Sequence, residues 1–330
     1  MMKIYRGLSE LPPDFSKTVV TIGNFDGVHR GHRWVLARVR ERAAALDAKS
    51  IAVTLDPHPA RVLRPERAPK LITPLQRKLE LLAETGLDAT LVLPFSEEMS
   101  HTSAEEFARG VLHEALHAVE VHEGEDFRFG YRAESDVEGL ASLGKKLGFA
   151  VHAYHPLEVR GEAVSSSRIR KLLCAGDVSA ARALLGTTFS IDSTPASGRG
   201  YGTKYAVPTI NLASYSELLP ANGVYVTRLR IADEWFDGVT NIGNRPTFGA
   251  DSFAVESHLF DFHPVDLTET TPLRMEFLKR LRDEMKFPDV DALRAQIGLD
   301  VTRAQRWFRI HRAVATQHLS AAAPASLQEQ

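Results

Sequence analysis

Hydrophobic residues in the first half of the chain form short β-branched runs that alternate with stretches of helical spacing. These patterns predict strands at 18–22, 51–55 and 90–93, and helices at 34–46, 73–86 and 104–117. Thr73 is predicted to cap the second of these helices, with Pro74 at its first position. Strands that alternate with such helices predict an α/β fold with a doubly wound parallel sheet, which binds ligands at the carboxyl ends of its strands.

The pattern changes near residue 186, where strand-like segments punctuated by Gly, Pro and Asn take over. Strands are predicted at 189–191, 225–229, 236–239 and 254–259, and they indicate a small antiparallel β-barrel. A last helix, which carries Leu293, Ile297 and Val301, is expected to pack on this barrel.

A chain of 330 residues is too long for one compact core of ordinary size and comfortable for two domains. The change of pattern places these domains at 1–185 and 186–315. The small and polar residues of 316–330 predict a disordered tail.

The composition narrows the class of protein. Hydrophobic residues make up 44% and charged residues 25%, which is typical of a soluble globular protein. The 40 basic and 42 acidic side chains give a formal charge of −2, without the basic excess expected of a nucleic-acid-binding protein. The single Cys174 excludes an intrachain disulfide and suits a reducing compartment. Without a signal peptide or a long apolar run, we expect a cytoplasmic protein with no membrane contact and no obligate protein partner.

The loop after the first predicted strand carries residues suited to binding phosphate. Gly23 and Asn24 end the strand, and His29, Gly31 and His32 lie where the next helix begins. Helical residues three apart face the same way, so both imidazoles can point at one anion, which Gly31 lets approach the backbone. Unpaired N–H groups at the helix start add partial positive charge. This arrangement suits displacement at phosphorus without a protein nucleophile. The alternative is a pair of surface histidines after an ordinary loop.

A second phosphate-binding segment is predicted at 164–170. The hydroxyls of Ser166 and Ser167 stand at a helix start, where they can cap the backbone or bind phosphate. Arg170 lies three residues after Ser167, so both can reach the same triphosphate. A plain serine cap with solvated arginines is the alternative.

The predicted barrel contains a third candidate site. A glycine-rich turn holds Gly198, Gly202 and Lys204, and its spacing fits neither a P-loop nor a dinucleotide-binding fingerprint. Thr209 and Asn211 follow it and share one face of a strand, where their oxygens can ligate Mg²⁺. A flexible hairpin with a structural threonine is the alternative.

These segments together resemble the bacterial bifunctional riboflavin kinase/FAD synthetase family, from end to end apart from the tail. The adenylyltransferase motifs are matched by 23–32, by 55–59 with Leu55 in place of Phe, by 124–130, and by 164–170 with Ser167 in place of Thr. The kinase motifs are matched by 208–211, 223–225, 241–248 and 255–262. The kinase loop departs from the pattern, since Ala206 replaces its third glycine and Val207 its usual Phe.

The resemblance implies roles for the adenylyltransferase residues. His29 and His32 would bind and stabilise the ATP phosphates with Gly23, Asn24 and Gly31. Ser166, Ser167 and Arg170 would hold the β/γ end of the triphosphate. The flavin would be bordered by Asp56, Pro57, His58, Asp126 and Phe127.

For the kinase, the resemblance implies that Glu256 is the catalytic base and that Thr209 and Asn211 hold Mg²⁺. Gly198, Gly202 and Lys204 would contact the ATP phosphates. The expected activity is phosphorylation of riboflavin to FMN, followed by adenylyl transfer from ATP to FMN to give FAD. The alternative is a monofunctional FAD synthetase whose barrel only binds flavin.

One further motif carries different chemistry. His113, Glu114 and His117 match the H-E-x-x-H pattern of zinc proteases. Glu120 and Glu123 stand where one such family needs glycine and histidine, so we interpret this match as chance.

Overall fold

The computed structural model describes residues 1–12, 15–196, 209–244, 253–263, 265 and 267–321. Two compact units emerge, one of Met1–Lys171 with Arg182–Thr187 and one of Leu172–Ala181 with Thr188–Gln330. The domain limits at 185 and 315 stay predictions.

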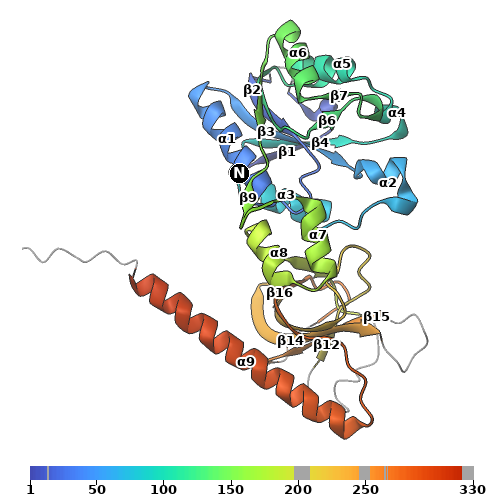
Figure 1. Cartoon of the computed structure of the whole chain (residues 1–330), viewed down its shortest axis with the longest axis vertical. Helices are drawn as coiled ribbons and strands as arrows, with labels where there is room; N and C mark the ends of the chain where they lie inside the picture. Colours follow the sequence, from blue (N-terminus) through green and yellow to red (C-terminus); the bar gives the residue numbers. More distant parts are fainter. Residues whose placement is uncertain (13–14, 197–208, 245–252, 264, 266, 322–330) are drawn as a thin grey trace, which may run out of the picture. The chain divides into compact units, whose positions relative to one another are not determined.

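Unit 1 is built on a parallel sheet of six strands (Figure 1). In spatial order the strands are β1 (Lys3–Arg6), β4 (Ala89–Pro94), β3 (Lys49–Asp56), β2 (Thr18–Ile22), β5 (Ala118–Gly124) and β8 (Ala150–Tyr154). Strands that are covered on both faces need nearly continuous apolar sequence, and every residue of β2 is buried. Two short antiparallel ribbons, β6–β7 (Arg128–Phe129 and Ser135–Asp136) and β9–β10 (Glu158–Val159 and Glu162–Ala163), lie outside the sheet.

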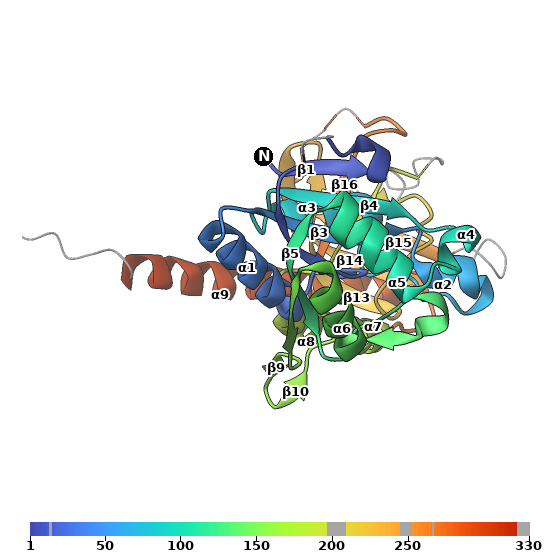
Figure 2. The same cartoon turned by 90° about the horizontal axis from the view of Figure 1, so that it is seen from above.

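Helices cover both faces of this sheet (Figures 1 and 2). Leu36 and Val39 of α1 (Arg30–Ala45) pack in one core cluster with Leu82 of α3 (Leu75–Ala83). The opposite cluster receives side chains from α5 (Ala104–Phe107), from the π-helical segment Ala108–Ala115 and from α6 (Val137–Leu147). The doubly wound α/β fold predicted from the sequence is therefore confirmed. The remaining helices are α2 (Pro59–Leu63), α4 (Glu97–Ser100), α7 (Ser166–Cys174), α8 (Val178–Leu185) and the 3₁₀ turns Leu8–Glu10, Pro65–Arg67 and Tyr131–Ala133.

The predicted start of α3 is wrong. Pro74 occupies the N-cap, Leu75 is the first helical residue, and no side chain caps the helix. The Thr73 hydroxyl instead accepts a hydrogen bond from the backbone N–H of Gly27, at 2.8 Å. A residue that looks like a local cap thus serves a contact to a distant loop.

Unit 2 is an antiparallel sheet that curls on itself. Its strands are, in spatial order, β11 (Ser190–Ser193), β16 (Leu273–Arg282), β13 (Gly223–Ile231), β14 (Glu234–Asn244), β15 (Phe253–Leu259) and β12 (Thr209–Asn211). The chain beyond one edge strand meets the chain beyond the other, since Pro195 bridges Leu212 and the Ala196 N–H donates to the Asn211 carbonyl at 2.8 Å. These contacts confirm the predicted antiparallel barrel.

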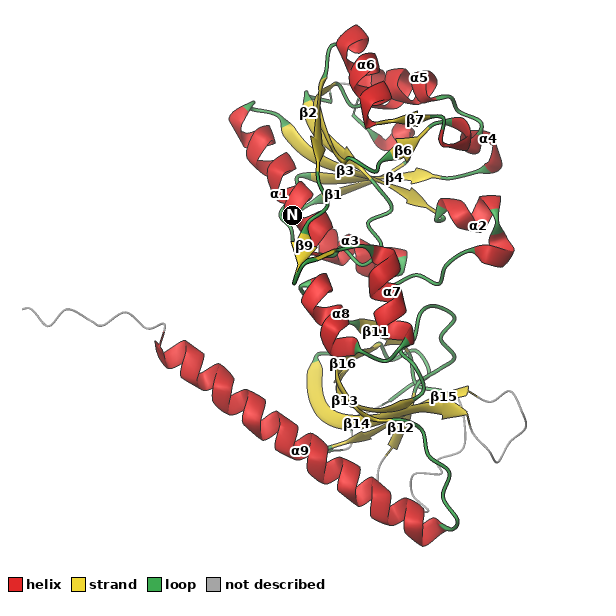
Figure 3. Ribbon diagram, viewed as in Figure 1, coloured by secondary structure: helices red, strands yellow, loops and turns green. Residues whose placement is uncertain are grey.

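A long helix, α9 (Val290–Ala321), packs on one face of the barrel (Figure 3). Ala304 and Phe308 join Val301 in a cluster with barrel residues such as Val226. The predicted packing of the helix on the barrel is confirmed, and it takes place around Val301, whereas Leu293 and Ile297 are 38% and 37% exposed. The apolar spacing of α9 thus includes its first turns, which the side chains of the barrel do not cover. The helix also runs past residue 316, where the sequence predicts a tail. None of the described helices is long and apolar enough to cross a membrane.

Candidate active sites

The parallel sheet opens where β2 and β5 separate. The two strands pair from Thr18 to Val20, and the chain order of the sheet reverses between them. Farther along, the Glu123 carboxylate accepts a hydrogen bond from the Ile22 N–H at 2.5 Å. Glu123 is 3% exposed, and burial raises the pKa of its carboxyl well above the usual value. A crevice at such a reversal point is the usual ligand site of an open α/β sheet.

Two stacked histidines lie at the start of α1, the helix that follows β2 in the chain. His29 is the N-cap of the helix, and its Nδ1 accepts from the His32 N–H at 3.3 Å. The two rings stack with centroids 3.5 Å apart and planes 14° from parallel. Burial lowers the pKa of His29 to about 4 and also lowers the pKa of His32 well below 6.5. Both rings are therefore neutral near pH 7 and would serve a phosphate as N–H donors.

The loop between β2 and α1 holds an unusual backbone conformation. Phe25, Gly27 and Val28 have φ angles of 46°, 90° and 38°. A positive φ is an outlier for a β-branched valine, and such strain is concentrated at functional sites. At Gly31, an added Cβ would lie 3.3 Å from the His29 ring, so a side chain there would press on the histidine pair.

Asp26 connects the loop between β2 and α1 to Thr73 and to α7. The Asp26 side chain is 3% exposed. Its carboxylate accepts hydrogen bonds from the Thr73 N–H at 2.9 Å and from the Arg170 guanidinium at 2.5 Å. Ser166 donates to the Asp26 carbonyl at 2.8 Å. Two of the residues predicted to bind phosphate, Ser166 and Arg170, thus converge on the histidine loop, while Ser167 is exposed at the start of α7.

We expect Asp26→Asn to lower the free energy of unfolding of unit 1 by about 3 kcal/mol, because it removes the buried carboxylate that pairs with the half-buried Arg170 guanidinium. Denaturant unfolding monitored by circular dichroism measures this. The control is Glu162→Gln, which breaks the more exposed pair that Glu162 makes with Arg168, also on α7, and should cost no more than about 1 kcal/mol. Equal losses in the two variants would contradict the structural role of Asp26.

The residues predicted to border the flavin flank β2 on both sides. Asp56 ends β3, and His58 caps α2, where its Nδ1 accepts from the Ala60 N–H at 3.2 Å. Asp126 and Phe127 follow β5 on the other side of β2. Asp126 is exposed, whereas Phe127 is half-buried and stacks on Phe129 with ring centroids 5.4 Å apart. The Asp56–Pro57 peptide bond is cis. Because β3, β2 and β5 are parallel neighbours, these residues and the histidine pair all follow the carboxyl ends of adjacent strands, on the same side of the sheet.

Lys78 is a buried charged residue near the histidine loop that was not predicted from the sequence. It lies on α3 with 6% exposure, and its Nζ donates to the Thr54 hydroxyl at 3.1 Å. The available signal was its position, three residues after Leu75 and four before Leu82, within the apolar stripe of the helix. A charged residue in such a stripe is directed toward the protein interior.

Strand register brings the candidate kinase residues together in unit 2. Asn211 of β12 lies opposite Glu256 of β15, and Thr209 lies opposite His258. Directly opposed residues project to the same face, so Thr209, Asn211 and Glu256 share one face of the sheet. The Thr209 hydroxyl and the Asn211 amide oxygen are donors that suit Mg²⁺, and the Glu256 carboxylate lies on the same face beside them. Gly198, Gly202 and Lys204 lie outside the described residues, as does the departure at Ala206.

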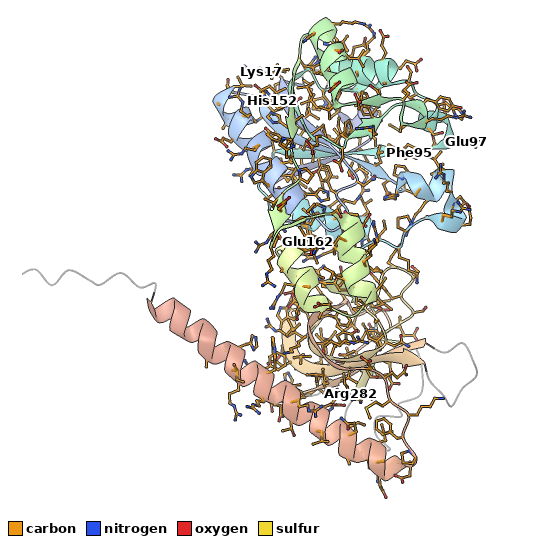
Figure 4. All side chains as sticks on the ribbon, viewed as in Figure 1. Lys17, Phe95, Glu97, His152, Glu162 and Arg282 are labelled. Atoms are coloured by element: carbon orange, nitrogen blue, oxygen red, sulfur yellow. The ribbon has the colours of Figure 1, made fainter. Side chains whose placement is uncertain are left out.

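Among the described residues, one group of three metal-type ligands comes together, formed by Glu120, His122 and His152. Of these, His152 is labelled in Figure 4. Arg42 of α1 donates to both oxygens of the Glu120 carboxylate, at 2.5 and 2.9 Å. The group is thus an ion-pair network that fastens α1 to the sheet. His113, Glu114 and His117 of the H-E-x-x-H match are not part of this group. The first two lie in the π-helical segment and His117 follows it with a φ of 48°, so they do not have the α-helical spacing that this zinc motif needs.

This network predicts acid sensitivity. The Arg42 guanidinium lowers the pKa of Glu120 from its usual 4.5 to about 2. A lowered carboxyl pKa contributes stability above pH 4.5 that is lost as the pH falls toward 2. The difference in unfolding free energy between wild type and Glu120→Gln should therefore be constant near neutral pH and shrink below pH 4.5. Urea titrations from pH 7 downward measure it, and a difference independent of pH would contradict the assignment.

Together, the histidine pair on a parallel sheet and the oxygen donors on an antiparallel barrel define a two-domain nucleotide-dependent transferase. Comparison with known proteins narrows this class. Residues 11–168 match the family model of FAD synthetase, and residues 185–308 match that of riboflavin kinase. The chain belongs to the bifunctional riboflavin kinase/FMN adenylyltransferase family.

Similar proteins extend over nearly the whole chain. The bifunctional riboflavin kinase/FMN adenylyltransferase of Pseudomonas fluorescens is 37% identical, over 92% of this chain and 97% of that protein. The protein of the same name from Escherichia coli K12 is 32% identical, over 93% of this chain and 98% of its own length. A crystal structure described as a macrolide-efflux protein from Streptococcus pneumoniae has a TM-score of 0.81 at 26% identity, over 91% of this chain and 97% of that one. The resemblance stated from the sequence motifs is confirmed, and both halves of the family are present.

Proposed function

We propose that the chain phosphorylates riboflavin to FMN at the barrel and adenylylates FMN to FAD at the parallel sheet, using one ATP in each reaction. The observation that carries this proposal is that the chain holds two separate residue sets, the His29–His32 stack in unit 1 and the Asn211–Glu256 register pair in unit 2. Each set suits direct displacement at phosphorus between bound substrates, which needs positioning and charge stabilisation and no covalent protein intermediate.

In the adenylyl transfer, a phosphate oxygen of FMN attacks the α-phosphorus of ATP. The bond from that phosphorus to the bridging oxygen of the β-phosphate breaks, and pyrophosphate leaves. His29, His32 and the first N–H groups of α1 would donate hydrogen bonds to the phosphate oxygens as charge shifts onto the leaving group. Arg170, whose orientation is set by Asp26 and by the Lys70 carbonyl at 3.0 Å, would hold the leaving end with Ser166 and Ser167.

In the kinase reaction, Glu256 would orient the terminal hydroxyl of riboflavin and accept its proton as the oxygen attacks the γ-phosphorus. The bond from that phosphorus to the oxygen that bridges it to the β-phosphate breaks, and ADP leaves. Thr209 and Asn211 would hold Mg²⁺, which neutralises charge on the ATP phosphates when bound. The kinase glycine-rich turn with Gly198, Gly202 and Lys204 would add phosphate contacts. A cytoplasmic location stays a prediction from the single Cys174.

Stoichiometric release of pyrophosphate tests the assignment of the two reactions. With FMN and ATP, wild type should release one pyrophosphate for each FAD formed. With riboflavin and ATP, ADP should appear before any pyrophosphate. Release of pyrophosphate from ATP in a reaction that contains no flavin, or formation of FAD without release of pyrophosphate, would contradict the proposed chemistry.

A further inference from the structure

The buried ammonium of Lys78 has fewer partners than its charge requires. Its Nζ makes one hydrogen bond, to Thr54, although an ammonium carries three N–H donors. Within the part of the chain that the structure describes, no carboxylate oxygen lies within 4.0 Å of this nitrogen. Thr54 in turn reaches the Asn24 carbonyl at 3.4 Å, so Lys78 is linked to the loop before α1.

Burial makes this arrangement costly for the free protein. A charged amine in a desolvated position is disfavoured unless it is paired, and burial lowers the pKa of Lys78. The charges of Asp26 and Asp56 oppose this shift, but neither carboxylate forms an ion pair with Lys78 among the described residues, and Asp26 is already bonded to Arg170 and to the backbone at 72–73. The Lys78 ammonium therefore has two N–H donors without a partner among the described residues, and a bound anion would accept hydrogen bonds from them.

The surroundings of Lys78 indicate where that anion lies. Its charge contributes to the lowered pKa values of both His32 and His58, so the ammonium lies within electrostatic reach of the predicted ATP and flavin sides. Thr54 is two residues before Asp56 on β3, on the same face of the strand. Two buried polar atoms of this site, Asn24 Oδ1 and His32 Nδ1, also have no hydrogen-bond partner among the described residues. Lys78 Nζ, Asn24 Oδ1 and His32 Nδ1 can thus each make further hydrogen bonds, and all three belong to the region of the histidine loop.

We propose that Lys78 is a phosphate-binding residue of the adenylyl transfer site, which contacts the phosphates where that of FMN meets the α-phosphate of ATP. This inference rests on the proposed function of unit 1. Two phosphates that approach each other repel, and one buried cation between them reduces that repulsion more than a solvated one would. Lys78 therefore supplies the positive charge that the neutral histidine pair lacks.

Lys78→Met tests the inference, because it keeps most of the side-chain length and removes the charge. We expect kcat/KM for FAD formation to fall about 100-fold or more, as for removal of one electrostatic contact to a transition state. A higher KM for FMN would assign the contact to the flavin phosphate, and a higher KM for ATP would assign it to the nucleotide. A lower kcat with both KM values unchanged would assign it to the transition state.

Two internal measurements separate phosphate binding from a structural role. Riboflavin phosphorylation by the same preparation should stay at the wild-type rate, since it takes place in unit 2. The thermal midpoint should stay unchanged or rise, because an unpaired buried charge has been removed. Lys145→Met, which removes an exposed ammonium on α6, is the matched control and should leave all readouts unchanged.

FAD formation within twofold of wild type in Lys78→Met would overturn the inference. A parallel loss of FAD formation and of thermal midpoint would also overturn it, because Lys78 would then be structural. If wild type makes no FAD, the proposed function fails, and calorimetric binding of inorganic phosphate, which can occupy the position of the FMN phosphate or of the α-phosphate, decides the role of Lys78 separately. Weaker binding by Lys78→Met would support a phosphate site, and equal binding would overturn it.

Discussion

His32→Ala is expected to lower the rate of FAD formation from FMN by about 10²–10³ while riboflavin phosphorylation continues at the wild-type rate. The His32 ring stacks on His29 and is neutral near pH 7, so it acts through a directed N–H. Its Nδ1 is buried without a partner among the described residues, which leaves it available to a ligand. Chromatographic separation of riboflavin, FMN and FAD after incubation with ATP measures both reactions in one sample.

The matched control for this variant is His155→Ala, because the side chain of His155 is 92% exposed. That change should leave both reactions intact. FAD formation in His32→Ala at the wild-type rate would remove the histidine pair from the reaction. Loss of both activities together would show that the substitution had acted through the fold.

Glu256→Gln is expected to lower riboflavin phosphorylation by about 10²–10⁴, the usual contribution of a general base. The amide keeps the size of the side chain and its place opposite Asn211 but cannot accept the hydroxyl proton. FAD formation from added FMN should continue at the wild-type rate, because the histidine pair lies in unit 1. The initial rate of FMN formation from riboflavin measures the effect.

Glu269→Gln, which changes an exposed glutamate between β15 and β16, serves as the control and should phosphorylate riboflavin normally. If Glu256→Gln kept the kinase rate, another group would have to accept the proton. If FAD formation from FMN fell in parallel, the two reactions would not be separable by residue.

Much of the fold could be predicted because its signals are local. The apolar runs of β2 and β3 are buried on both faces of the sheet, so they appear in the sequence as unbroken β-branched stretches. The start of α3 could not be predicted, because the Thr73 hydroxyl bonds to Gly27, 46 residues away, instead of to its own helix. The apolar spacing at Leu293 and Ile297 predicts a helix correctly but cannot show how far the barrel covers it.

In the candidate sites, too, the residues that form local motifs could be predicted, whereas contacts between distant residues could not. Motifs located the histidine pair and the barrel residues, because the residue types at those spacings suit chemistry at phosphorus. The ion pair of Asp26 with Arg170 spans 144 residues, and the hydrogen bond from Ile22 to Glu123 spans 101, so no local pattern predicts either. Lys78 is visible in the sequence as a charge within an apolar stripe, but only the structure shows that its Nζ makes one hydrogen bond to the residues that are described.

The most direct measurement of the central claim is a time course of purified protein with riboflavin, ATP and Mg²⁺, in which the flavins are separated by chromatography. The proposed function predicts that riboflavin declines while FMN and then FAD appear, with His32→Ala stopping at FMN and Glu256→Gln making FAD only from added FMN. Riboflavin that stays unchanged while added FMN becomes FAD would contradict the claim and leave a monofunctional FAD synthetase.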